Sequence, residues 1–198
     1  PTAADGKEPV GSMGDDTPLM MLSDQPHGFH HYFRQNFSQV TNPPIDSLRE
    51  RGAMSLFTRF GNDGNFLALN NSYKTSIVLE SPVLLSHELA ELESCFPDKI
   101  AVIETLFEIG DEQANNALRK GIDRIIAEAE AAVLRGCYVV LTDQGRSAER
   151  AAVPMILATA AVNTHLVKRK MRKGASIIVR SAECFDVHHL AVLIGVGA

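Results

Sequence analysis

Histidines are the first candidates for chemistry in this sequence, because they can ligate metals and move protons near neutral pH. His27, His30 and His31 lie close together, and His188 is followed directly by His189. His27 and His31 could share one helix face, but no cysteine or carboxylate completes a ligand set beside them. Adjacent helical residues point about 100° apart, so the second pair cannot face one metal. We therefore expect surface histidines or hydrogen-bonded core histidines.

The cysteines are Cys95, Cys137 and Cys184, which are odd in number and far apart. This usage disfavours a disulfide framework and indicates a reducing, cytoplasmic compartment. Cys184 precedes an expected helix and has His188 four residues on, an arrangement that could activate a nucleophile. Small buried thiols are the more common outcome, and we expect that one here.

A turn at the end of an expected strand carries the next charged group. Neither G-x-G-x-x-G after a strand nor a P-loop motif occurs, so no phosphate loop is indicated. Asp143, Arg146 and Arg150 instead lie where α/β proteins place their ligands, and they could bind an anion. We favour a structural role for them, in which they fix the turn between strand and helix.

A stiff loop is the remaining candidate. Pro43 and Pro44 fix an extended backbone. They hold Thr41 and Asn42, whose side chains compete well for hydrogen bonds. Such a loop could be a plain connection between helices, a wall of a channel or an interface.

The elements that position these residues differ between the two parts of the chain, which divides at about residue 98. Residues 1–98 are irregular and punctuated by Pro, Gly, Asn and Asp. Short helices are expected over residues 29–38, 46–60 and 86–95, with Ser86 as the N-cap of the last.

Residues 99–198 are regular. Strands are expected over residues 99–107, 137–142 and 175–180, and helices over residues 112–135, 153–171 and 187–194. This alternation implies parallel strands with right-handed crossovers. The predicted fold class is α/β: an irregular helical first half followed by a βαβαβα parallel unit. An open parallel sheet and part of a barrel fit equally well.

Composition limits the partners. The 198 residues are 45% apolar and 22% charged, as in globular proteins, and the net charge of −5 disfavours nucleic acid and anionic membrane surfaces. No apolar run approaches the roughly 20 residues that cross a bilayer. The chain begins with proline and ends in apolar residues 191–198, so we expect a segment of a larger polypeptide.

Several motifs match one known family in order. The run Gln39-Val-Thr-Asn-Pro-Pro-Ile-Asp46 resembles the central domain of the glutamate synthase large subunit. Gly11-Ser-Met-Gly-Asp-Asp16 resembles the segment that opens that domain, and Asp143-Gln-Gly145 and Val187-His-His189 follow in the expected order. The resemblance covers nearly the whole chain.

The resemblance implies an enzyme that reductively transfers the amide nitrogen of glutamine to 2-oxoglutarate, giving glutamate. An amidotransferase domain would release ammonia, and a later domain would carry FMN and an iron–sulfur cluster. The central domain would link these two domains of the same chain and contribute to the ammonia tunnel. A small electron-transfer subunit or ferredoxin would be a further partner. The resemblance therefore implies no catalytic, metal or cofactor-binding residue in this chain, which we expect to be inactive alone.

The residues expected at the tunnel or at a domain interface are Thr41, Asn42, Pro43, Pro44, Ser12 and Met13. Gly11-Ser-Met13 could instead derive from a cloning vector, but its family-like continuation favours native sequence. Arg146 and Phe185 depart from many family members, which weakens any claim that they do chemistry. Two alternatives stay open. One is a free-standing α/β enzyme that uses the loops at the strand ends, and the other is a binding module without chemistry.

Overall fold

The computed structural model describes residues 19–34, 48, 52, 55–61, 76–109 and 114–198. The chain divides into two compact units, residues 1–55 and residues 56–198. The described part of the first unit contains two 3-10 helices, η1 (Met20–Leu22) and η2 (Phe29–Phe33). The second of these is shorter than the helix expected over residues 29–38. The second unit contains the sheets that are described below.

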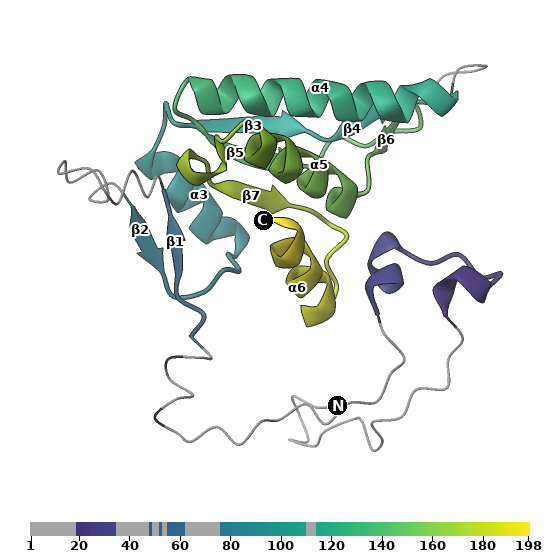
Figure 1. The fold of residues 1–198 in the computed structure, drawn as a ribbon, viewed down its shortest axis with the longest axis horizontal. Helices are drawn as coiled ribbons and strands as arrows, with labels where there is room; N and C mark the ends of the chain where they lie inside the picture. The colour runs from purple at the N-terminus through teal and green to yellow at the C-terminus, as the bar shows by residue number, and fades with distance from the viewer. Residues whose placement is uncertain (1–18, 35–47, 49–51, 53–54, 62–75, 110–113) are drawn as a thin grey trace. The chain divides into compact units, whose positions relative to one another are not determined.

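Three parallel strands form the centre of the second unit (Figure 1). They are β3 (Ile100–Glu104), β5 (Tyr138–Thr142) and β7 (Ile177–Arg180), in the order β3-β5-β7. Every residue of β5 is buried, as its continuous apolar run predicts. The parallel pairing places Val139 opposite Ile177. The α/β fold class is therefore confirmed.

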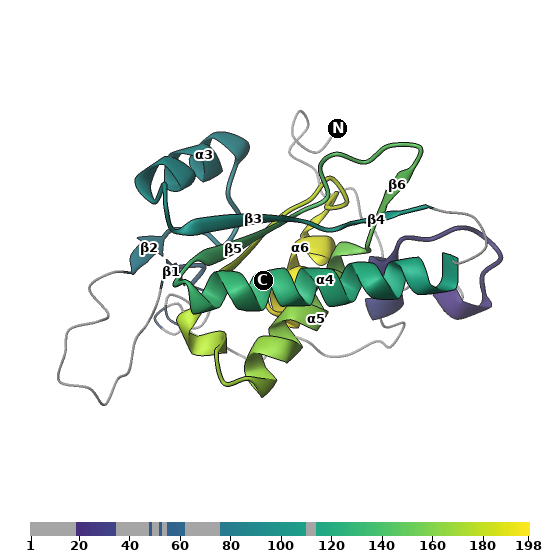
Figure 2. The same cartoon turned by 90° about the horizontal axis from the view of Figure 1, so that it is seen from above.

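Helices α4 (Ala114–Leu134), α5 (Met155–Lys168) and α6 (Val187–Val196) share one core cluster with the central sheet. Figure 2 shows α4 and α5 on the same side of β3 and β5. Leu141 and Val162 are fully buried in this cluster. Burial stabilises the fold by about 1.5–3 kcal/mol for each such side chain. Among the described residues, no helix combines the length and apolarity that a membrane span requires.

The opposite face of the sheet is covered by α3 (Ser86–Cys95) and by the antiparallel pair β1 (Thr58–Phe60) and β2 (Ile77–Leu79). The rings of Phe60 and Tyr138 lie 4.7 Å apart, in the edge-to-face arrangement that aromatic pairs favour. This packing joins residues 56–98 to the parallel unit. The compact unit thus begins at residue 56, whereas the change in composition lies near residue 98.

Two expected elements differ from the structure. Thr58–Phe60 forms β1 and does not continue the helix expected over residues 46–60, of which Leu48 and Gly52 are helical and the other positions up to residue 54 lie outside the description. α3 has the expected bounds, but its N-cap is Leu85 rather than Ser86. The carboxylate of Glu88 accepts the Leu85 N–H at 2.6 Å, which satisfies that end of the helix.

The strand expected over residues 99–107 divides into two. Thr105 donates its backbone N–H and its hydroxyl to the Thr142 carbonyl, at 2.8 and 3.0 Å. Beyond it, β4 (Leu106–Glu108) leaves β5 and pairs antiparallel with β6 (Arg150–Ala152). A run of β-branched residues predicts extended backbone, but it does not predict that a strand changes its partner.

Glu130 joins α4 to α5. Its carboxylate accepts one hydrogen bond from His165 Nε2 at 2.6 Å and one from Arg169 Nε at 2.9 Å. The hydrogen bond with His165, helped by Arg169, lowers the pKa of Glu130 from its ordinary value of 4.5, although burial opposes this shift. The folded chain therefore favours the ionised carboxylate.

Replacing Glu130 with glutamine should reduce stability most above about pH 5 and least in acid. The lowered pKa means that the carboxylate stabilises the fold above its unfolded pKa, and this contribution disappears as the pH falls through the folded pKa. Denaturant midpoints measured from neutral pH to pH 3 should therefore converge for the two proteins. Glu128→Gln is the matched control, because Glu128 pairs with Arg124 on the exposed surface of the same helix. Parallel curves for Glu130→Gln and the native chain would contradict this expectation.

Candidate functional site

The residues predicted at the tunnel or interface lie outside the described part of the chain. They are Thr41, Asn42, Pro43, Pro44, Ser12 and Met13. Their assignment stays a prediction. The strand-end turn, the cysteines and the second histidine pair lie in the described part of the second unit.

Asp143 follows β5 directly, and its side chain is buried. Its carboxylate accepts a hydrogen bond from the Ser181 hydroxyl at 2.8 Å and one from the Ala182 N–H at 3.1 Å. Arg146 lies 3.7 Å away, at ion-pair distance. These bonds tie the end of β5 to the loop that follows β7. Asp143 therefore holds two strand ends together, which is a structural role, but the turn it begins leads to β6 (Arg150–Ala152) and not directly to the expected helix.

The three charged residues of the turn do not form one anion site. Arg146 lies between Asp143 and Glu183, at 3.9 Å from the latter. Arg150 points elsewhere, because its guanidinium binds Glu104 at 2.6 Å and lies 3.4 Å from Glu108. Each arginine already faces two carboxylates, which would oppose the binding of another anion.

Cys184 has the opposite environment from an activated thiol. Burial raises its pKa, and the negative charges of Glu183, Asp143 and Asp186 raise it further. A raised pKa lowers the thiolate fraction, so the geometry disfavours a nucleophile at this position. Cys137 is half-buried and directs its thiol to the Asp98 carbonyl at 3.8 Å.

His189, the second histidine of the pair in the second unit, contributes to the start of α6. Asp186 accepts the backbone N–H of His189 at 2.9 Å and so caps the helix. The buried ring of His189 accepts the Phe185 N–H at its Nδ1, at 3.1 Å. In the described part of the chain, no three His, Cys, Asp or Glu side chains are grouped so that they could hold a metal ion.

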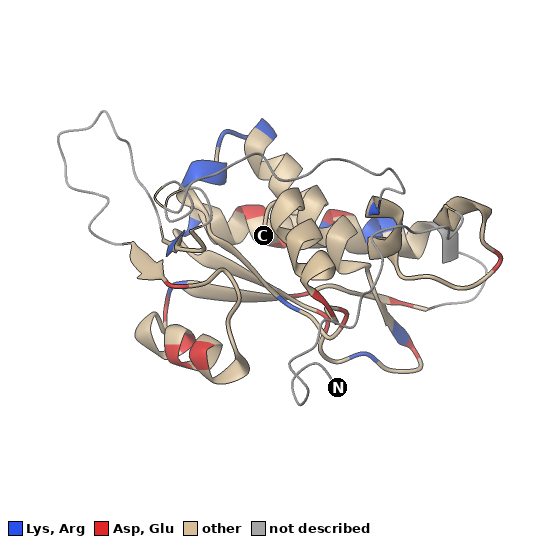
Figure 3. Ribbon diagram, turned by 90° about the horizontal axis from the view of Figure 1, so that it is seen from below, with Lys and Arg blue, Asp and Glu red and all other residues tan. Residues whose placement is uncertain are grey.

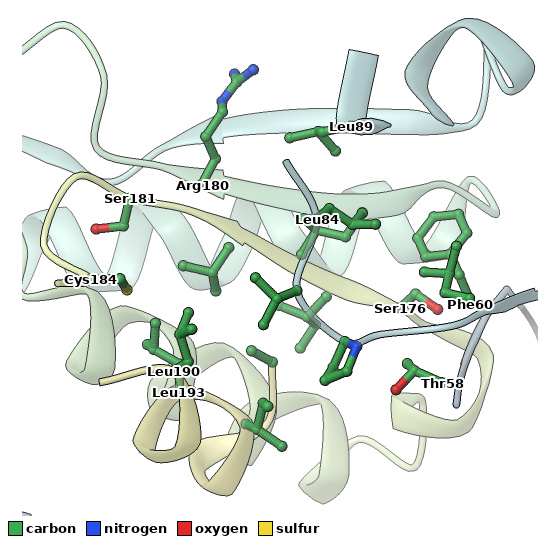
Figure 4. A pocket seen from close by; sticks show the side chains of 18 of the residues that line it. Thr58, Phe60, Leu84, Leu89, Ser176, Arg180, Ser181, Cys184, Leu190 and Leu193 are labelled. Atoms are coloured by element: carbon green, nitrogen blue, oxygen red, sulfur yellow. The ribbon is translucent and has the colours of Figure 1, made fainter. Parts of the chain in front are cut away.

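A groove lies at the edge of the central sheet in the second unit (Figure 4). Its volume is about 820 Å³. Leu84, Leu89 and Leu193 supply apolar walls, whereas Ser176 and Arg180 supply polar groups from β7 and the residue before it. Sequence reasoning missed the groove, because its lining runs from residue 58 to residue 198 and no local motif marks it. The groove offers binding surface and no described nucleophile with a lowered pKa.

The whole chain, residues 1–198, matches the family model described as the glutamate synthase central domain. A relative from Azospirillum brasilense, named glutamate synthase [NADPH] large chain, is 51% identical over 100% of this chain and 13% of its own length. Ferredoxin-dependent glutamate synthase 2, chloroplastic, of Arabidopsis thaliana is 44% identical over 99% of this chain and 12% of its own. Glutamate synthase [NADH] of Schizosaccharomyces pombe is 39% identical over 100% of this chain and 10% of its own. The chain thus spans about an eighth or less of these relatives.

Proposed function

The chain belongs to the glutamate synthase central domain family, and from this premise we propose that it links the catalytic domains of a glutamate synthase. The observation that carries the proposal is the family match over residues 1–198, together with relatives named glutamate synthase that are 39–51% identical. The reaction of the whole enzyme would be the reductive transfer of the amide nitrogen of glutamine to 2-oxoglutarate, giving two molecules of glutamate in all.

A linking role agrees with what the described side chains do. Asp143 and Arg146 hold loops together, and the pKa of Cys184 is raised. These engagements favour a linking domain over a free-standing enzyme that uses the same loops. We propose that the amidotransferase chemistry, the FMN and the iron–sulfur cluster belong to neighbouring domains, which are its partners. A small electron-transfer subunit or ferredoxin would supply electrons, since the relatives' names include NADPH, NADH and ferredoxin.

Within this role, we propose that Thr41 and Asn42 line or gate the ammonia path, with Pro43, Pro44, Ser12 and Met13 at its wall or at a domain interface. Ammonia is small and neutral, but water protonates it. A path must therefore exclude solvent and still offer a few hydrogen-bonding groups. A backbone stiffened by two prolines presents such groups with little conformational entropy left to lose.

The test is Thr41→Val in the full-length enzyme, which keeps the shape of the side chain and removes its hydroxyl. Glutamine hydrolysis and glutamate formation are measured together. We expect either free ammonia to escape or both activities to fall, because a gate that loses a polar group no longer passes or retains ammonia correctly. Thr164→Val is the matched control, since Thr164 is exposed on α5.

The outcome that would overturn the assignment of Thr41 is a variant with the native rate and the native ratio of the two activities. The linking function itself has a separate test. In an enzyme from which residues 1–198 are deleted, glutamine hydrolysis should no longer be coupled to glutamate formation. Preserved coupling in that enzyme would contradict the linking function.

A further inference from the structure

The open edge of β7 is the starting point. β7 is the last strand of the three-stranded sheet in the part of the chain that the structure describes. Val139 donates its N–H to the Ser176 carbonyl at 3.0 Å, and Val139 lies opposite Ile177 in the parallel register. In a parallel ladder, this arrangement turns the N–H and C=O groups of Ile177 and Val179 away from β5. Their backbone groups therefore face outward along this edge.

The groove follows that edge. It is lined by every residue from 175 to 181, so it meets side chains from both faces of β7. Because successive side chains of a strand point to opposite faces, a cavity that touches all of them lies along the edge and not on one face. α6 closes one side, and residues 58–61 with α3 close the other. Ser176 closes one end, where its hydroxyl bonds to the N–H and C=O of Gly61, both at 3.0 Å.

The charge of the groove is mostly positive. Its described lining contains the basic residues Arg59, Arg172, Lys173 and Arg180, and the acidic residue Glu93. Glu93 lies 3.8 Å from Arg180. Arg59 and Lys173 make no ion pair with another described residue. Figure 3 shows the corresponding basic positions on β1 and in η4 (Arg172–Gly174), after the end of α5. The groove therefore favours a segment that carries carboxylates.

We propose that the groove receives an extended acidic segment, which adds to β7 as a fourth strand of the central sheet. Apolar side chains of the segment would pack between α6 and the side formed by β1 and α3, and its carboxylates would meet Arg59 and Lys173. A helix would not serve, because it satisfies its own backbone and leaves the outward groups of Ile177 and Val179 unbonded. Strand addition satisfies them. The source of the segment is a neighbouring domain of the enzyme, and that source alone rests on the proposed linking function.

The probe is a synthetic peptide in which valine and glutamate alternate. It is added to the 198-residue chain, and amide hydrogen exchange of that chain is measured residue by residue. At a peptide concentration about ten times the Kd, exchange at Ile177 and Val179 should slow about tenfold. Exchange at Ile178 and Arg180 should change less, since these amides already face β5. A peptide in which valine and lysine alternate should give no protection at the same concentration.

Two variants and one control locate the effect. Val179→Pro removes an outward N–H, which an edge strand tolerates, and should abolish the protection of the remaining reporter, the Ile177 amide. Val102→Pro is the matched control, because the register directs the Val102 N–H away from β5 at the opposite edge of the same sheet. Arg59→Glu combined with Lys173→Glu keeps the backbone edge and should weaken binding of the acidic peptide at least tenfold.

Equal protection by the acidic and basic peptides would overturn the proposed chemistry of the segment. No protection with either peptide, or undiminished protection of the Ile177 amide in Val179→Pro, would overturn strand addition. The deletion test of the linking function does not involve the peptide. A failure of one proposal can therefore be distinguished from a failure of the other.

Discussion

Replacing Arg172 with methionine should lower the free energy of unfolding by about 3 kcal/mol. The guanidinium donates to the Asn163 side chain at 2.7 Å, to the Ala175 carbonyl at 2.5 Å and to the Gly197 carbonyl at 2.8 Å. These acceptors belong to α5, to the residues before β7 and to the end of α6. Burial lowers the pKa of Arg172, so the guanidinium is partly shielded from water, and its removal would leave three part-buried acceptors without a donor. Methionine keeps much of the stem and loses every donor.

The control is Arg169→Met, one turn away at the end of α5. Arg169 is 60% exposed and pairs with Glu130 at 2.9 Å, so its loss should cost no more than about 1 kcal/mol. Urea unfolding monitored by circular dichroism measures both variants. A cost for Arg172→Met no larger than that for Arg169→Met would show that the three hydrogen bonds add little to stability. Arg172→Lys should fall between the two, because an ammonium cannot reproduce the planar fork.

The regular half of the chain was predictable because its patterns are local. The apolar run of β5 and the helical spacing of Ile125 and Ala129 on α4 each depend on a few neighbouring residues. Alternating strands and helices then imply a parallel sheet. The helix expected over residues 112–135 and the observed α4 (Ala114–Leu134) agree within the uncertainty of any helix end.

The candidate sites depend on distant partners, and the sequence carries no local sign of these. Arg146 and Arg150 are four residues apart, yet they face different carboxylates, Glu183 and Glu104. Strand pairing changes at Thr105, whose N–H still bonds to the Thr142 carbonyl of β5, whereas its carbonyl accepts the Val153 N–H beside β6. The groove likewise combines the edge of β7 with α3 and α6. Such juxtapositions follow from packing of the whole unit, which residue spacing alone does not predict.

Replacing Gly121 with alanine should destabilise the fold by about 1–2 kcal/mol, although alanine is the better helix former. A Cβ at this position of α4 would lie 2.9 Å from the Phe107 Cβ, closer than two such carbons approach. Phe107 cannot move its Cβ without moving the backbone of β4, which is paired to β6. The overlap should cost about 1–3 kcal/mol, and the gain of up to about 1 kcal/mol from helix propensity offsets part of it.

Gly195→Ala in α6 isolates the propensity effect. A Cβ at Gly195 meets no heavy atom within 4 Å, so alanine should stabilise the fold by about 0.5 kcal/mol there. The same substitution thus has opposite signs in two helices of one chain, and the difference measures how closely α4 approaches β4. Thermal or urea unfolding of both variants gives that difference directly. If Gly121→Ala were as stabilising as Gly195→Ala, α4 and β4 would have to be farther apart than the structure places them.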